Sequence, residues 1–157
     1  MNAINQNMPV VIHETDDYRL RLAKPEDNQA LCALFRDLDM DAELRLTEER
    51  DPNFFGLHQL HLGTPYTVVL EDTSPELPSP QVVGCCSVIV RDGWHNGQPV
   101  RIGYSGDLRV LPTWRKARVF PLAVKKFTRY LEEKEGVQVI FCAMMRENIR
   151  AKGARLL

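Results

Sequence analysis

The chain has 157 residues, of which 44% are hydrophobic and 26% are charged, so it can form one globular domain with a buried core. Its formal net charge of −1 at pH 7 lacks the basic excess that is typical of general nucleic-acid binding. No apolar stretch approaches the ~18 residues of a membrane span, and residues 1–17 lack the segments of a signal peptide. We therefore expect a cytoplasmic protein without a nucleic-acid or membrane partner.

Charge is distributed unevenly along the chain. Residues 14–51 contain 12 acidic and 6 basic side chains, whereas residues 100–157 contain 13 basic and 5 acidic ones. A cationic second half suits a small polyanionic ligand. A solvated helix face would give the same count, so both interpretations stay open.

Cysteine and histidine spacing indicates no metal centre and no disulfide framework. Cys32, Cys85, Cys86 and Cys142 lie in apolar runs without a CxxC pair, which predicts buried free thiols in a reducing compartment. Neighbouring Cys85 and Cys86 should point to opposite faces of one strand. A metal site on one helix face would use His58 and His61, but no third ligand is near, and the pair is better interpreted as surface histidines.

The first half predicts a strand followed by an amphipathic helix. We expect residues 1–16 to be a flexible tail and residues 17–157 to be one domain. Residues 18–22 alternate apolar and charged side chains, which predicts a half-buried strand. Pro25 and two acidic residues then open a helix with apolar positions at helical spacing. Segments 44–50 and 54–62 are compatible with short helices.

The second half predicts a strand meander and then a crossover. Strands are expected at 67–71, 81–91 and 100–111, with Gly84 as a bulge and residues 92–99 as a turn. Short connections favour antiparallel pairing. A helix over 119–135, with Gly136 as its C-cap, leads to an apolar strand over 137–144 that should be buried on both faces. Another helix begins near Asn148. The fold class is therefore α/β, with a mixed, mostly antiparallel sheet flanked by helices.

A short basic loop between a strand and a helix is the strongest functional motif. It follows Val110-Leu111-Pro112 and contains Arg115, Lys116 and Arg118 just before the predicted helix. Free N–H groups and the helix dipole favour phosphate at such a helix start, and the basic side chains add donors. The loop is therefore a candidate pyrophosphate site that needs no metal.

This motif resembles the GNAT superfamily of acetyl-CoA-dependent N-acetyltransferases, in which a strand ending in V-x-P precedes an R-x-x-G-x-G/A loop and a helix. Asn148-Ile149-Arg150-Ala151 is similar to the N-x-x-A opening of the next family helix. The resemblance implies acetyl-CoA as co-substrate, no metal, and transfer of an acetyl or related acyl group to the primary amine of a small molecule or peptide by direct attack.

The resemblance also implies roles for individual residues. The backbone of Leu108, Arg109 and Val110 would run beside the pantetheine arm of CoA. The loop of Arg115, Lys116, Ala117, Arg118, Val119 and Phe120 would wrap the pyrophosphate, and Asn148 would contact the CoA arm. The acyl thioester would lie where the two parallel strands separate. Candidates for the general base are Asp107, Tyr104 and Glu147, although a solvated carboxylate or a core tyrosine is the more ordinary interpretation of each.

The sequence departs from the family pattern at two places. Arg118 and Phe120 stand where the family loop has glycines, and Arg155 stands about where the family helix often has a proton-donating tyrosine. The final strands of the fold are also missing, so we expect an incomplete domain, completed by a homodimer partner or a missing C-terminal segment. The alternative to an enzyme is a degenerate GNAT-like module that binds CoA or supports another domain without catalysis.

Overall fold

The computed structural model describes residues 9–38, 48–115 and 119–143. These residues form one six-stranded sheet in the order β1-β2-β3-β4-β5-β6. Neighbouring strands are antiparallel, except that β5 and β6 are parallel. The predicted mixed, mostly antiparallel sheet is confirmed. The strands are β1 (Val11–Glu14), β2 (Tyr18–Leu22), β3 (Thr64–Asp72), β4 (Gln81–His95), β5 (Gln98–Val110) and β6 (Val137–Cys142).

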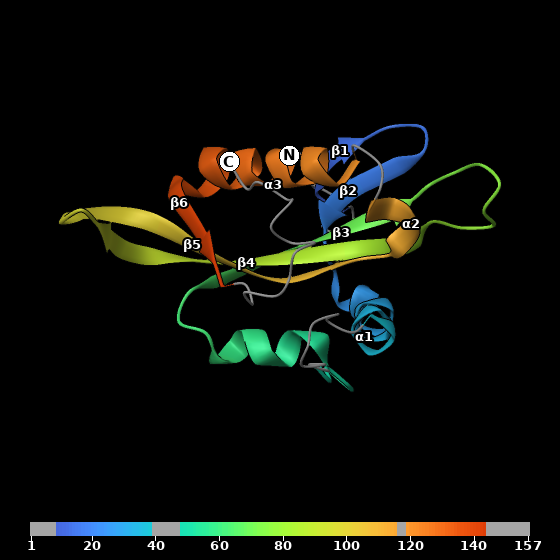
Figure 1. Cartoon of the computed structure of the whole chain (residues 1–157), viewed down its shortest axis with the longest axis horizontal. Helices are drawn as coiled ribbons and strands as arrows, with labels where there is room; N and C mark the ends of the chain where they lie inside the picture. The colour runs from blue at the N-terminus through green and yellow to red at the C-terminus, as the bar shows by residue number, and fades with distance from the viewer. Residues whose placement is uncertain (1–8, 39–47, 116–118, 144–157) are drawn as a thin grey trace, which may run out of the picture.

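Helices cover both faces of this sheet. Helix α3 lies across one face, and α1 lies with η2, the green helix in Figure 1, below the other. We call these the α3 face and the α1 face. None of the described helices has both the length and the apolar character needed to span a membrane. The helical segments are η1 (Pro25–Asp27), α1 (Asn28–Asp37), η2 (Phe54–Leu60), α2 (Pro112–Arg115) and α3 (Val119–Glu135).

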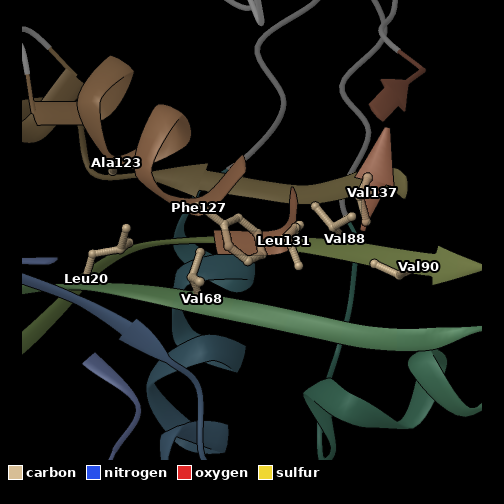
Figure 2. Close-up of a cluster of buried hydrophobic side chains, with 8 residues drawn as sticks. All are labelled: Leu20, Val68, Val88, Val90, Ala123, Phe127, Leu131 and Val137. Atoms are coloured by element: carbon tan, nitrogen blue, oxygen red, sulfur yellow. The ribbon is translucent and has the colours of Figure 1, made fainter. Parts of the chain in front are cut away.

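The core on the α3 face is entirely apolar. Ala123, Phe127 and Leu131 recur every four residues, so they form one stripe along α3. Figure 2 shows this stripe packed on side chains of the sheet, which are Leu20, Val68, Val88, Val90 and Val137. The helix predicted over 119–135 is confirmed at both ends. Gly136 ends it with a φ of 67° and an N–H that donates to the Glu132 carbonyl at 3.0 Å, as a C-cap glycine should.

The core on the α1 face combines apolar packing with buried ions. Its apolar members are Leu31, Cys32, Leu34, Phe35, Phe54, Val69 and Cys85. Cys86 packs on the opposite face, so the prediction that neighbouring cysteines separate across the sheet is confirmed. Arg21 also lies on the α1 face, where it forms a bidentate pair with Asp27 at 2.7 and 2.8 Å and a third bond to Glu71. We call these three residues the Arg21 network; it ties η1 to two strands.

Three sequence predictions need correction. The tail predicted over 1–16 is shorter, because residues 11–14 pair with β2 as strand β1. The turn predicted over 92–99 is only Asn96-Gly97, because both residues adopt positive φ and close a tight hairpin in which β4 and β5 continue to the tip. Residues 48–50 are not helical, whereas residues 39–47 lie outside the described residues.

Strand β6 is less buried than its apolar sequence predicts. Only Val137 is fully buried, and Phe141 is 43% exposed. In the described part of the chain β6 pairs with β5 alone, so it is an edge strand. A continuous apolar run shows that a strand can be buried but not which of its faces is covered. The helix predicted from Asn148 lies outside the described ranges and stays a prediction, as does the expectation of an incomplete domain.

Candidate functional site

The two parallel strands separate at the carboxyl end of β5. Their pairing runs from Arg101–Val137 to Ser105–Cys142, whereas β5 continues to Val110. Within the described residues, positions 106–110 of β5 therefore pair with β4 on one side and have no strand on the other. We call this stretch the open edge of β5. An open edge presents main-chain donors and acceptors that another extended chain can bind.

The main-chain groups of Leu108 and Val110 face the open edge. The N–H of Leu111 donates to the Val83 carbonyl of β4 at 2.8 Å, and strand groups alternate in direction, so Leu108 and Val110 point away from β4. Their carbonyls accept hydrogen bonds from guanidinium groups instead. Arg109 Nη1 donates to the Leu108 oxygen at 3.0 Å, and Arg115 Nε donates to the Val110 oxygen at 2.7 Å.

An apolar hollow lies beside the open edge, between the sheet and the first turns of α3. Ser105, Leu108 and Val110 line it from β5, and Phe120 and Val124 line it from α3. The hollow and the open edge share Leu108 and Val110. A ligand that bonds to the edge can therefore place aliphatic groups in the hollow.

The predicted phosphate loop is only partly described. Arg115 ends α2 and is exposed, while Val119 and Phe120 begin α3. Lys116, Ala117 and Arg118 lie outside the described residues, so the loop's contact with phosphate stays a prediction. Pro121 lies in the first turn of α3, where its missing N–H costs no helical hydrogen bond.

A β-bulge at the open edge changes the face of the sheet to which its side chains point. Ser87 pairs with Gly106 and Cys85 pairs with Arg109, so two residues of β5 lie opposite Cys86. Asp107 adopts a φ of 54° there. As a result Ser105 lines the hollow on the α3 face, whereas Asp107, two residues later, points to the α1 face. In a regular strand these two side chains would share a face.

Asp107 is held as a buried carboxylate. His58 Nε2 lies 2.8 Å from one of its oxygens, and Arg50 pairs with the other. Burial alone would raise the pKa of Asp107, but the hydrogen bond from His58 and the charge of Arg50 outweigh it and hold the pKa below its ordinary value. A low pKa and two occupied oxygens make a weak general base at neutral pH. The predicted catalytic role of Asp107 is not tested by this geometry.

The surface position predicted for His58 is wrong. Its side chain is 5% exposed and packs against Phe54 and Phe55. His61, its predicted partner, is exposed. In the described ranges no group of three or more His, Cys, Asp or Glu side chains is arranged to hold a metal ion. Only the tertiary structure pairs His58 with a carboxylate 49 residues away.

The other candidate residues give less information about catalysis than Asp107 does. Tyr104 is half-buried on β5, with its ring centroid 5.4 Å from that of Phe141. Glu147 and Asn148 lie outside the described residues. Burial raises the pKa of the Cys85 thiol and raises that of Cys86 to about 11, so neither is a ready nucleophile.

Comparisons with known proteins identify the fold. No protein-family model matches the sequence, and no curated protein matches it. Among solved structures, a predicted acetyltransferase from Clostridium acetobutylicum, solved with acetyl-CoA, has a TM-score of 0.61 and 15% identity over 89% of this chain and 90% of that one. An aminoglycoside antibiotic 6'-N-acetyltransferase from Acinetobacter baumannii has a TM-score of 0.63 and 12% identity over 87% of this chain and 85% of that one.

A third solved structure is glucosamine-6-phosphate N-acetyltransferase from Arabidopsis thaliana. Its TM-score is 0.58, with 15% identity over 92% of both chains. Identities this low establish similarity of fold alone. The chain therefore has the fold of the acetyltransferases that its sequence motif resembles.

Proposed function

Because the chain has the fold of GNAT acetyltransferases, we propose that it transfers an acetyl group from acetyl-CoA to a primary amine. The open edge of β5 is the observation that carries this proposal. Within the described residues, the outward carbonyls of Leu108 and Val110 accept hydrogen bonds from arginine side chains, and an apolar hollow lies beside them. A solved structure of similar fold contains acetyl-CoA.

The chemistry of the open edge fits the pantetheine arm of CoA. The arm carries amide groups that can pair with a strand edge, as a neighbouring strand would. Its aliphatic carbons match the apolar lining that Leu108, Phe120 and Val124 provide. The N-terminus of α3 and the exposed guanidinium of Arg115 are suited to the phosphates. Arg115 would then exchange its bond to the Val110 carbonyl for a charged partner.

The proposed reaction is a direct displacement. The nitrogen lone pair of the amine attacks the thioester carbonyl, the N–C bond forms, the C–S bond breaks, and CoA leaves as the thiol with the proton that the amine loses. The amine must be neutral when it attacks. Of the three predicted bases, Asp107 is the least suited, because both of its oxygens are paired and its pKa is lowered. Tyr104 and Glu147 stay the better candidates.

The fold itself does not identify the acceptor. The acceptors named for two solved structures of similar fold, an aminoglycoside antibiotic and glucosamine-6-phosphate, are chemically unlike each other. Either a small molecule or a peptide amine agrees with the proposal at this level.

Calorimetric titration of the chain with acetyl-CoA tests the proposal. We expect saturable binding, and Arg115→Ala should weaken it by about tenfold, as expected for loss of one charge-assisted hydrogen bond. Arg129→Ala is the matched control, because Arg129 is an exposed arginine further along α3 that pairs with Glu133. Absence of binding at millimolar acetyl-CoA, by a chain whose circular dichroism shows that it is folded, would contradict the proposal.

A CoA-binding module without catalysis is the second candidate function. The paired, low-pKa state of Asp107 favours it, as do Arg118 and Phe120 in place of glycines. The release of free CoA thiol in the presence of a panel of amines separates the two. Binding without any amine-dependent thiol release supports the module, and amine-dependent release supports the transferase.

A further inference from the structure

Two arginine side chains meet over one aromatic ring on the α1 face of the sheet. The guanidinium carbon of Arg109 lies 4.3 Å from the centre of the Phe35 ring, and that of Arg50 lies 5.0 Å from the same centre. Their side chains are only 10% and 6% exposed. Two cations are therefore held almost out of water, which is costly unless anions accompany them.

The hydrogen bonds of these two arginines are incomplete. Arg50 pairs with Asp107 and Glu48, whereas Arg109 reaches the Leu108 carbonyl and, at 3.5 Å, a Glu48 oxygen. In the described structure the buried atoms Arg50 Nε, Arg50 Nη1 and Arg109 Nε have no hydrogen-bond partner. Burial lowers the pKa of Arg109, which reflects the same shortage of compensating charge. Buried donors of this kind can bind a ligand with several acceptor oxygens.

Glu48 is the member of the cluster that the anionic group of a ligand could most readily replace. Its carboxylate bridges both guanidinium groups, and its side chain is 35% exposed, against 11% for Asp107. Two guanidinium groups converging on one carboxylate is also how proteins bind carboxylate and phosphate ligands. Glu48 therefore holds a position that the anionic group of a ligand can take.

The cluster adjoins the open edge of β5. Arg109 lies between Leu108 and Val110, so its side chain occupies the α1 face of the same short stretch whose edge is proposed to bind acetyl-CoA. A molecule anchored by an anionic group on Arg109 would keep its amine close to this stretch. The two arginines and the proposed binding edge for acetyl-CoA therefore meet at the same stretch of β5.

We propose that Arg50 and Arg109 bind the carboxylate or phosphate group of an anionic amine acceptor, which displaces Glu48. The proposal rests on the transferase function and names its substrate class. It favours amino-acid-like or phosphorylated amines over neutral amines and polyamines, even though the first half of the chain is acidic overall.

Four small amines of similar length test the substrate class: β-alanine, 2-aminoethyl phosphate, ethanolamine and ethylenediamine. With acetyl-CoA as donor, kcat/KM should be at least about tenfold higher for one of the two anionic amines than for the neutral and cationic ones, because hydrogen bonds to charged groups discriminate at this level. The better of the two anionic amines identifies carboxylate or phosphate as the group recognised. Equal turnover of all four amines would overturn the anion site.

Two variants with opposite expected effects test the assignment to residues. Glu48→Gln removes the internal competitor, so the KM for the anionic amine should fall by about threefold or more, whereas Arg109→Gln should raise it by about tenfold. Glu49→Gln removes the same charge from an exposed neighbour and is the matched control. A purely structural Glu48 predicts loss of stability and no gain in affinity.

Calorimetry with inorganic phosphate and with acetate, in the absence of CoA, keeps this test independent of turnover. Binding of one of them that Arg109→Gln weakens and Glu48→Gln strengthens supports the anion site, even if no amine is acetylated and the transferase proposal fails. Binding whose affinity is the same in Arg109→Gln, Glu48→Gln and the wild type overturns the anion site and leaves the transferase proposal standing. Absence of binding by the folded chain does the same. If Arg109→Gln does not fold, Arg109→Lys replaces it in this test, because lysine keeps the positive charge but loses the bidentate hydrogen-bonding geometry of the guanidinium group.

Discussion

The α1 face of the sheet contains two buried ionic clusters that differ in how well their donors are satisfied. In the Arg21 network one guanidinium meets two carboxylates and the Leu22 carbonyl through Nη1 and Nη2, and the buried Glu71 Oε2, which lacks a hydrogen bond, lies 3.2 Å from the cationic Arg19 Nε. In the cluster of Arg50 and Arg109, two guanidinium groups share a half-exposed Glu48 and leave three buried nitrogens unpaired. The comparison separates an ion cluster that fixes the fold from one that has capacity for a ligand.

The same substitution in the two clusters should therefore have unequal effects on stability. Arg21→Gln removes the guanidinium that pairs with the buried carboxylates of Asp27 and Glu71, although Glu71 keeps Arg19 at 3.2 Å, so the free energy of unfolding should fall by about 4 kcal/mol. Arg109→Gln loses one long ion pair, the hydrogen bond to the Leu108 carbonyl and the contact with Phe35, but it strands no buried carboxylate, so the loss should be about 1 kcal/mol. Urea denaturation measures both values. Equal losses would remove the distinction between the clusters.

The contribution of the Asp107 carboxylate to the stability of the chain should depend on pH. Asp107→Asn leaves Arg50 short of a counter-charge, so the free energy of unfolding at pH 6 should fall by about 3 kcal/mol. The pKa of Asp107 is lowered in the folded chain, so its stabilising contribution is complete above its unfolded pKa of about 4 and is lost as the pH falls through the folded value. The wild-type and variant curves should therefore converge in strong acid.

Urea denaturation at a series of pH values checks this convergence. A difference that stays constant down to about pH 2 would show that the carboxylate charge is not the source of the stability. Asp51→Asn is the control, because Asp51 pairs with Arg36 at the surface, where both side chains are exposed.

The smallest expected effect is stabilisation by an anion. Inorganic phosphate at ten times its dissociation constant should raise the free energy of unfolding by about 1.4 kcal/mol, seen as a higher Tm. The rise should disappear in Arg109→Gln and persist in Arg129→Gln, an exposed change on α3. A rise that survives in Arg109→Gln would place phosphate elsewhere on the chain.

The open edge of β5 was partly accessible to sequence reasoning. The family resemblance carried by Val110-Leu111-Pro112 and Arg115 implied that the two parallel strands separate near the backbone of Leu108–Val110, and the pairing of β5 with β6 does end before this stretch. The bulge at Asp107-Leu108 was not predicted, because a bulge depends on the register between two strands and has no local sequence period. The sequence also did not predict that Arg115 donates a hydrogen bond to a main-chain carbonyl.

By itself, the sequence determined the elements whose residues interact with near neighbours. The alternation in residues 18–22, the helical spacing in 119–135 and the glycine after it are local patterns, and β2, α3 and the C-cap follow from them. Only the tertiary structure decided that Arg50, His58 and Asp107 form one buried cluster. Asp107 lies 57 residues from Arg50 and 49 from His58, and an isolated charge or histidine in a sequence carries no information about its distant partner.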